Sequence, residues 1–189
     1  MRTRDFGDYH FAPTGVFRQP DEAAANGPWD YVIVTTKALP DVSDDSVLVA
    51  PFVSAGTAIV LIQNGIGVEQ PYRTRFKDTA IISGVTVCSA EQVEPGVVVQ
   101  NRWTRISLGP FTQGKGGPGT ATEADARTRE FAELLGNGGI KDAEVYDERM
   151  LQMVRWHKIA VRAFWQRRGV GVIMTLIMPL SHLLRSTLP

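Results

Sequence analysis

Continuous apolar runs alternate with more polar, helix-compatible segments between residues 31 and 88. Tyr31–Thr35, Ala58–Ile62 and Ile81–Cys88 are rich in β-branched residues, as expected for parallel strands buried on both faces. The intervening segments 41–52 and 68–76 are compatible with helices, and Asp or Ser is available as the first N-cap. This strand–helix–strand–helix–strand order predicts right-handed crossovers and a parallel sheet.

The segments on either side of this unit follow different patterns. Residues 5–28 are polar and rich in turn formers, with two candidate short strands, "FGDYHFAP" and "TGVFR", and a small helix, "QPDEAAANG". After residue 88, "GVVVQN" and "RISLGPF" have the spacing of a hairpin or of two antiparallel edge strands. The sequence then predicts a surface loop "TQGKGGPGTATEA", an amphipathic helix over 123–135 and a short strand "DAEVY".

Apolar residues recur at helical spacing from Asp147 onward, in "DERMLQMVRWHKIAVRAFWQ". We interpret this long helix as the first element of a second domain, which divides the chain into residues 1–146 and 147–189. Further on, Val170–Leu184 is apolar but is interrupted by Pro179, Ser181 and His182. It is short for a membrane span, which needs about 20 apolar residues, so we favour a buried segment.

Composition narrows the classes of function. The 189 residues carry 20 basic and 20 acidic side chains, and this balance argues against a nucleic-acid-binding protein. The single cysteine, Cys88, excludes an internal disulfide, and no Cys/His cluster suggests a zinc site. We interpret Cys88 as a small core residue, since strand neighbours surround it.

The N-terminus lacks the apolar core of a signal peptide, and a reducing, cytoplasmic location is expected.

Two of the expected strands end in polar residues. Lys37 follows "VIVTT", and Asn64 follows "IVLIQ". Ligands of parallel α/β sheets bind beyond the carboxyl ends of the strands, so both side chains are expected at one edge. Gly65 and Gly67 would let the backbone bend sharply there, and an Asn amide offers both a donor and an acceptor. The alternatives are a routine Asn-Gly turn and a solvated lysine.

A third candidate, Lys158, lies in "RWHKIAV" on the long helix. Presented toward the edge of the sheet, it could act as a general acid and as an anchor for an anionic substrate. The alternative is a surface lysine on an amphipathic helix. We interpret the neighbouring His157 as a surface or capping residue.

Several motifs together resemble the ketopantoate reductases (2-dehydropantoate 2-reductases), and the fungal members most. The motifs, which occur in the order found in that family, are "WDYVIVTTKALPD", "TAIVLIQNGIGVEQPYRTRF", "IISGVTV", "EPGVVVQN" and "WHKIAV". The resemblance spans residues 5–161. It implies a Rossmann domain that binds NADPH and a helical domain that closes over a 2-ketoacid.

The resemblance also implies roles for the three polar residues. Lys37 matches a lysine near the cofactor, and Asn64 matches an asparagine beside the nicotinamide and the substrate. Lys158 matches the catalytic lysine, which donates a proton to the carbonyl oxygen as hydride reaches the carbon. The substrate would be 2-dehydropantoate or a related 2-ketoacid of the pantothenate pathway. No metal, nucleic-acid or membrane partner is implied, and a homodimer is a candidate assembly.

The sequence departs from the family pattern in three ways. It lacks the opening strand and GxGxxG-type turn that would hold the pyrophosphate, and the basic residue that would hold a 2′-phosphate. Arg162 stands where the family usually has an asparagine, and the pattern stops at Val161. The serine and glutamate that complete the substrate site have no counterpart. We therefore expect an α/β fold with an incomplete Rossmann-type parallel sheet, without its first βαβ unit, followed by the start of a helical domain.

These departures suggest a chain truncated at both ends, and they argue against turnover by this chain alone. The leading interpretation is an NADPH-dependent ketoacid reductase. The first alternative is a non-catalytic remnant that requires a partner, or a mis-predicted gene-model fragment. A membrane-associated fragment is the second alternative.

Overall fold

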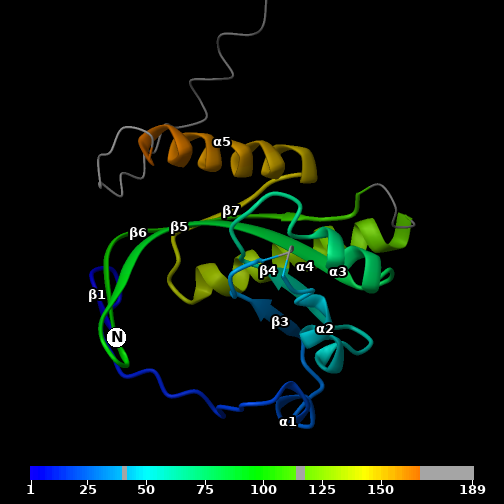
Figure 1. Ribbon diagram of the computed structural model, residues 1–189, viewed down its shortest axis with the longest axis horizontal. Coiled ribbons are helices and arrows are strands. Elements are labelled where there is room, and N and C mark those ends of the chain that lie inside the picture. The colour runs from blue at the N-terminus through cyan, green and yellow to red at the C-terminus, as the bar shows by residue number, and fades with distance from the viewer. Residues whose placement is uncertain (40–41, 114–117, 167–189) are drawn as a thin grey trace, which may run out of the picture.

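The computed structural model describes residues 1–39, 42–113 and 118–166, which form a mixed sheet covered by helices on both faces (Figure 1). The strands are β1 (Arg2–Thr3), β2 (Gly7–Asp8), β3 (Tyr31–Val34), β4 (Ala58–Leu61), β5 (Ala80–Glu94), β6 (Val97–Pro110) and β7 (Asp142–Val145). The helices are α1 (Pro20–Ala24), α2 (Ser46–Val49), η1 (Ala50–Phe52), α3 (Gln70–Arg75), α4 (Pro118–Asn137) and α5 (Glu148–Gln166).

The strand order is β2-β1-β6-β5-β4-β3, and β7 also pairs with β6. Strands β3, β4 and β5 are parallel, as the three apolar runs predict, and β5 pairs antiparallel with β6. All four residues of β4 are fully buried because helices cover both of its faces. The expected α/β class with a Rossmann-like parallel unit is confirmed.

Two separate clusters of apolar side chains form the core, one on each face of the sheet. On one face, Phe131 of α4 packs against Val60 and Ile82. On the other face, Tyr72 of α3 packs against Ile59 and Ile81. Alternating strand residues supply the two clusters because successive side chains point to opposite faces.

Helix α5 lies on the same face of the sheet as α3, opposite α4 (Figure 1). Its first turns approach β6 closely at Gly109. A Cβ on Gly109 would lie 2.9 Å from the carbonyl oxygen of Tyr146 and 3.2 Å from Cβ of Leu151. The missing side chain therefore lets α5 lie directly on the sheet, with Leu151 fully buried.

Some local predictions are wrong, and tertiary packing explains most of them. "GVVVQN" and "RISLGPF" belong to one continuous strand, β6, which pairs with β5 on one side and with β1 and β7 on the other. Register shifts near Ser89 and a positive φ at Trp103 absorb the irregular spacing that had indicated two strands. Cys88 is exposed rather than in the core, because the β5–β6 hairpin extends beyond the helices there.

Three further boundaries differ from the predictions. The helix expected over 41–52 is reduced to α2 and η1, and "TGVFR" forms no strand. Helix α4 begins at Pro118, within the segment expected to be a loop. Residues 114–117 and the apolar segment 170–184 lie outside the described residues.

Candidate functional site

The carboxyl ends of β3 and β4 lie side by side, as expected from their parallel pairing. Their register runs from Tyr31 opposite Ala58 to Val34 opposite Leu61. Just beyond, Nε2 of Gln63 donates hydrogen bonds to the hydroxyl and the carbonyl oxygen of Thr36, at 3.0 and 3.2 Å. These bonds connect the two loops that carry Lys37 and Asn64.

The loop after β4 bends at two glycines with left-handed backbone angles, φ 132° at Gly65 and 71° at Gly67. A residue with a side chain would be strained at either position, and a Cβ on Gly65 would also lie 2.7 Å from Val68. The predicted use of both glycines in a sharp bend is confirmed. This bend leaves Asn64 exposed at the edge of the sheet.

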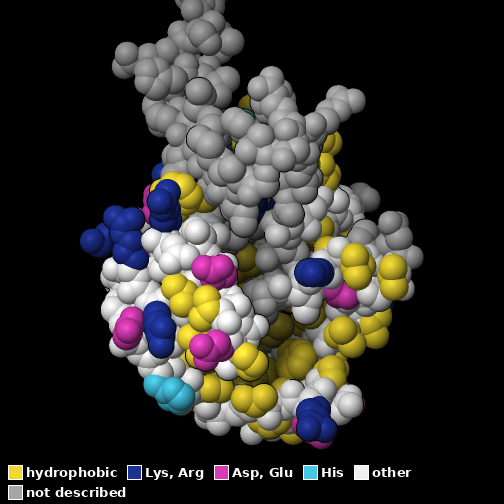
Figure 2. Space-filling model, turned by 60° about the vertical axis from the view of Figure 1, so that its left-hand side comes forward, with side chains coloured by type: hydrophobic (Ala, Val, Ile, Leu, Met, Phe, Trp, Pro, Cys, Tyr) yellow, Lys and Arg dark blue, Asp and Glu magenta, His cyan; other side chains and the backbone are white. Residues whose placement is uncertain are grey.

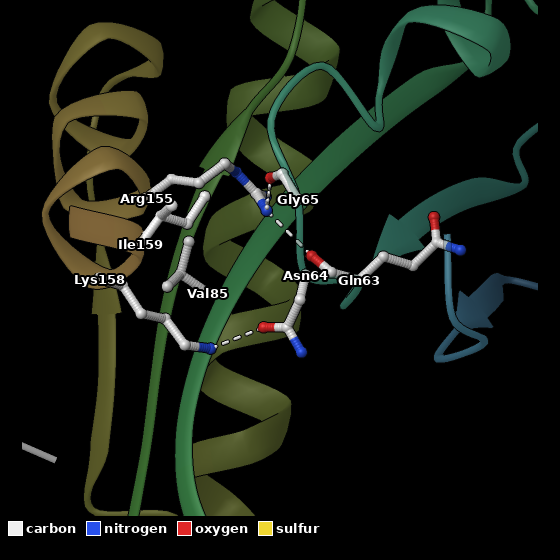
Figure 3. A pocket seen from close by; sticks show the side chains of 7 residues that line it. All are labelled: Gln63, Asn64, Gly65, Val85, Arg155, Lys158 and Ile159. Atoms are coloured by element: carbon white, nitrogen blue, oxygen red, sulfur yellow. Dashed lines mark hydrogen bonds between the residues drawn. The ribbon is translucent and has the colours of Figure 1, made fainter. Parts of the chain in front are cut away.

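Helix α5 brings Lys158 to Asn64 (Figure 3). Nζ of Lys158 donates hydrogen bonds to Oδ1 of Asn64 at 2.8 Å and to the carbonyl oxygen of Thr86 at 2.6 Å. The two residues are 94 positions apart in the sequence, so only the fold brings them together. Within the described part of the chain, Nδ2 of Asn64 donates to no protein acceptor, so this amide can bind a ligand.

A small pocket of about 40 Å³ lies beside this pair. Val85 and Ile159 form its apolar wall, and its other lining residues are Gln63, Asn64, Gly65, Arg155 and Lys158. Figure 3 shows the Lys158 ammonium and the Asn64 amide facing each other across the gap between α5 and the loop. The pocket thus combines an apolar wall with the Lys158 ammonium and the Asn64 carboxamide.

Arg155 lies one helical turn before Lys158 and is 3% exposed. Its Nη1 donates to the carbonyl oxygens of Gln63 and Gly65, at 2.9 and 3.1 Å. These two carbonyls belong to the residues immediately before and after Asn64. Arg155 therefore holds both sides of the peptide segment that carries the asparagine.

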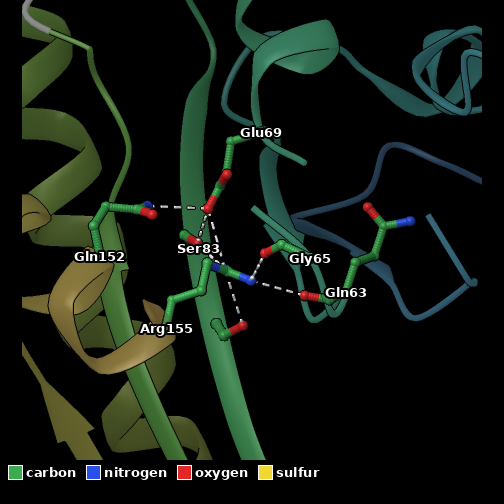
Figure 4. Close-up of polar contacts among 7 residues, drawn as sticks. Gln63, Gly65, Glu69, Ser83, Gln152 and Arg155 are labelled. Carbon is green, nitrogen blue, oxygen red and sulfur yellow. Dashed lines mark hydrogen bonds and ion pairs between the residues drawn. The ribbon is translucent and has the colours of Figure 1, made fainter. Parts of the chain in front are cut away.

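A buried carboxylate balances the charge of Arg155 (Figure 4). Oε1 of Glu69 lies 3.1 Å from Nη2 of Arg155 and accepts hydrogen bonds from Ser83 at 2.5 Å and Gln152 at 3.2 Å. Nη2 also donates to Oγ of Ser83 at 2.6 Å. Burial lowers the pKa of the Arg155 guanidinium, and the negative charge of Glu69 acts in the opposite direction. The pair is a desolvated, hydrogen-bonded ion pair that joins α5 to the sheet.

Lys37 does not line the pocket. It is exposed beyond β3, on the loop next to the one that carries Asn64. The structure therefore places Asn64 and Lys158 in one site, and Lys37 on the adjoining loop of the same sheet edge. His157 is exposed on α5, and the pocket has no contribution from it.

Sequence reasoning missed the buried polar residues below the pocket, above all Arg155 and Glu69. One signal was available, because Arg155 and Lys158 are three residues apart and share a helix face. The helix was assigned from its apolar positions, yet Met153 is 55% exposed whereas Arg155 is buried. A charged residue on the inward face of an amphipathic helix indicates a specific polar partner.

Among the described residues, no cluster of His, Cys, Asp or Glu is suited to hold a metal ion. None of the helices in the described ranges has the length and apolar character needed to cross a membrane.

The parallel β3–β4–β5 unit, with its polar loops at the carboxyl ends, defines a Rossmann-like α/β protein. The model of the family "Ketopantoate reductase PanE/ApbA" matches residues 1–113, and the chain belongs to this family. A search of curated proteins found no match.

Solved structures show the same relationship. The 2-dehydropantoate 2-reductase from Methylococcus capsulatus is 27% identical, with a TM-score of 0.65 over 84% of this chain and 47% of that one. The enzyme of that name from Geobacter metallireducens GS-15 is 31% identical, with a TM-score of 0.53 over 69% and 38% of the two chains. A D-mandelate dehydrogenase solved with NADH and anilino(oxo)acetate shares the fold at 21% identity, with a TM-score of 0.53 over 67% and 37%. The chain thus spans about half or less of the length of these proteins.

Proposed function

We propose that this protein is a nicotinamide-dependent reductase of 2-ketoacids, with NADPH as cofactor and 2-dehydropantoate or a related ketoacid as substrate. The observation that carries the proposal is the hydrogen bond of 2.8 Å between Lys158 and Asn64, beside a pocket at the carboxyl ends of the parallel strands. Membership of the ketopantoate reductase family supports the same reaction.

The chemistry requires a positive group at the carbonyl oxygen. When bound, the dihydronicotinamide would supply hydride to the carbonyl carbon, and negative charge would develop on the oxygen. The ammonium of Lys158 would stabilise that charge and then donate its proton to the oxygen. Nδ2 of Asn64, which donates to no acceptor among the described residues, would donate a hydrogen bond that orients the carbonyl of the substrate or the amide of the cofactor.

Arg155 has a different place in this scheme. Although its charge lies near the pocket, the guanidinium already binds Glu69, Ser83 and three backbone carbonyls. It therefore has little capacity left to bind a substrate carboxylate. Lys158 is the better anchor for the anionic ketoacid, because it is only half-buried and reaches the pocket with its Nζ.

The described residues fit the reacting end of the cofactor better than its phosphates. The pocket offers an amide donor and an apolar wall, which suit a nicotinamide ring. Helix α3, which follows the Gly65–Gly67 bend, has only six residues and a weak dipole. We assign Lys37 to cofactor binding, since it is an exposed cation on the neighbouring loop of the same edge.

The test is turnover and binding by the full 189-residue chain. We expect NADPH-dependent loss of 340 nm absorbance with 2-dehydropantoate, and NADPH binding by calorimetry with NADH as the comparison. Lys158→Ala should lower kcat about 10²- to 10⁴-fold, the usual contribution of a general acid. His157→Ala, an exposed neighbour on the same helix, should leave kcat unchanged. If the wild-type chain shows no turnover and does not bind NADPH, the proposal is refuted.

A non-catalytic role that depends on a partner is the second candidate, and the open edge of the sheet favours it. Ile33 lies in the middle of β3 and is 50% exposed. Figure 2 shows further hydrophobic side chains gathered around a hollow on one face. Exposed apolar strand edges promote association with another chain. Concentration-dependent sedimentation without any NADPH binding would support this role over the reductase.

We also propose that α5 is the first helix of a second domain, with the domain boundary between residues 146 and 147. The proposed homodimer is tested by the same sedimentation experiment. The proposed cytoplasmic location agrees with a single cysteine, Cys88, which is exposed and has no disulfide.

A further inference from the structure

We infer that Arg155 is the positioning residue of the site: it fixes Asn64 at hydrogen-bonding distance from Lys158. This inference deepens the proposed function, but the placement of the two side chains can be measured without turnover. It begins from the position of Arg155 and Lys158 on one helix face, three residues apart.

Both side chains contact the same short loop, in complementary ways. Nη1 of Arg155 binds the backbone on each side of Asn64, through the carbonyls of Gln63 and Gly65. Lys158 binds the Asn64 side chain itself. The backbone and the side chain of Asn64 are therefore both held from α5.

The loop needs this external support because of its own geometry. Gly65 and Gly67 have positive φ angles, and glycine has more accessible backbone conformations than any other residue. The carbonyl of Gly65 is one of the two that Arg155 binds, so the contact acts at the bend. Without it, Asn64 would sample orientations in which Oδ1 faces away from Lys158.

The other contacts of Arg155 fix the guanidinium on the sheet. Nη2 donates to Ser83 and to the carbonyl oxygen of Gly84 on β5, and Glu69 supplies the opposing charge. Ser83 points toward α5 because it alternates with Ile82, which faces α4. Arg155 thus joins three parts of the site: helix α5, strand β5 and the Asn64 loop.

Arg73 provides a matched control. It is also buried, at 5% exposure, and its guanidinium donates to four backbone carbonyls: those of Phe76, Lys77, Thr79 and Phe111. None of these carbonyls belongs to the pocket-lining residues. Replacing Arg73 should therefore weaken the fold and leave the Lys158–Asn64 pair intact.

The experiment measures acylation of Lys158 by an amine-reactive ester, with peptide mass spectrometry as the readout. Exposed Lys37 and Lys141 in the same chain serve as internal references. In Arg155→Met, we expect the labelling rate of Lys158 relative to these references to rise about tenfold, as for the loss of one charge-assisted hydrogen bond. In Arg73→Met, the ratio should remain within about twofold of wild type, although the melting temperature falls.

Arg155→Lys keeps the charge but not the planar fork that reaches two carbonyls and Ser83 together. Its Lys158 labelling ratio should lie between those of wild type and Arg155→Met, and this variant decides the question if Arg155→Met does not fold. A wild-type ratio in the folded Arg155 variants, or an equal rise in Arg73→Met, would overturn the inference.

Activity provides a second readout that rests on the proposed function. In a working reductase, Arg155→Met should lower kcat more than it raises KM, and Arg155→Lys should restore part of kcat. If the wild-type chain reduces no ketoacid, the proposed function fails, whereas the labelling ratio still decides the role of Arg155.

Discussion

Two buried arginines, Arg155 and Arg73, bind backbone carbonyls at different places on the same face of the sheet. Arg155 faces Glu69 at 3.1 Å, whereas Arg73 has no ion pair within 4 Å in the described part of the chain. Burial lowers the pKa of both guanidinium groups. The contacts of Arg73 join α3 to the ends of neighbouring strands, while those of Arg155 surround Asn64. Hydrogen bonds from a buried arginine to backbone carbonyls can thus stabilise the fold alone, as for Arg73. Where the carbonyls flank a site residue, as for Arg155 and Asn64, they also position that residue.

The largest expected effect is that of Arg155→Met on stability. Removing one partner of a buried ion pair should cost about 3–5 kcal/mol, because the Glu69 carboxylate stays buried without its cation. Urea unfolding followed by tryptophan fluorescence would measure this cost. A loss below about 1 kcal/mol would show that the ion pair is solvated, as surface pairs are.

Arg73→Met should be less costly. It leaves four carbonyls without a donor but no unpaired carboxylate, and we expect a loss of about 3 kcal/mol or less. The same urea titration makes the comparison with Arg155→Met direct. A larger loss of unfolding free energy in Arg73→Met than in Arg155→Met would show that the hydrogen bonds of Arg73 stabilise the fold more than the Arg155–Glu69 pair does.

The region around Arg73 should also lose stability at high pH. Tyr72 is 2% exposed, and burial, followed by the negative charges of Asp45 and Asp44, raises its pKa to about 12 from the usual 10. The folded state keeps the phenol protonated, so the contribution of Tyr72 is complete below pH 10 and is lost as pH rises from about 10 to 12. The loss should approach about 2 kcal/mol, and Tyr72→Phe should remove it.

The alkaline titration tests the region around Arg73 through its neighbour Tyr72. Between neutral pH and pH 11, wild type should lose stability relative to Tyr72→Phe, because Phe has no proton to lose. Tyr9→Phe, at an exposed tyrosine, serves as the control and should not flatten the pH profile. An identical alkaline slope in Tyr72→Phe and wild type would exclude Tyr72 as the source.

The smallest expected effect is that of Gly109→Ala, where α5 approaches β6. The added Cβ would meet the backbone carbonyl oxygen of Tyr146 at 2.9 Å, so the segment that leads into α5 must shift. We expect a loss of about 1–2 kcal/mol, within the usual range of overpacking costs. If Arg155 holds the helix independently of its first turn, Lys158 labelling should change less in Gly109→Ala than in Arg155→Met.

The sequence predicted the parallel unit well, because β4 and the first six residues of β5 are buried, and each strand begins with a mostly apolar run. The expected burial of both faces is wrong for β3, where Ile33 is exposed. Asn64 and its glycines could be predicted from the sequence, because a polar residue after an apolar run indicates the end of a strand. Glycine, in turn, indicates a position where the backbone can take a positive φ. The β5–β6 hairpin was divided wrongly, since a long strand that leaves the core changes its burial pattern along its length.

The partnership of Arg155 with Glu69 could not be predicted in the same way. Its members lie on α5 and on the segment before α3, 86 residues apart, and no periodic pattern links them. Charged residues are rarely fully buried, so their residue types gave no indication of burial either. Only the packing of α5 on the sheet brings the two charges together.

The most direct test of the central claim is a double-mutant cycle on Lys158 labelling, with Arg155→Met and Asn64→Ala as the single changes. If Arg155 acts on Lys158 through Asn64, the double variant should label no faster than Asn64→Ala, so the two effects are strongly non-additive. For Arg73→Met and Asn64→Ala, the changes in the logarithm of the Lys158 labelling rate should add in the double variant. Additive effects of Arg155→Met and Asn64→Ala would contradict the account, because Arg155 would then act on Lys158 independently of the loop.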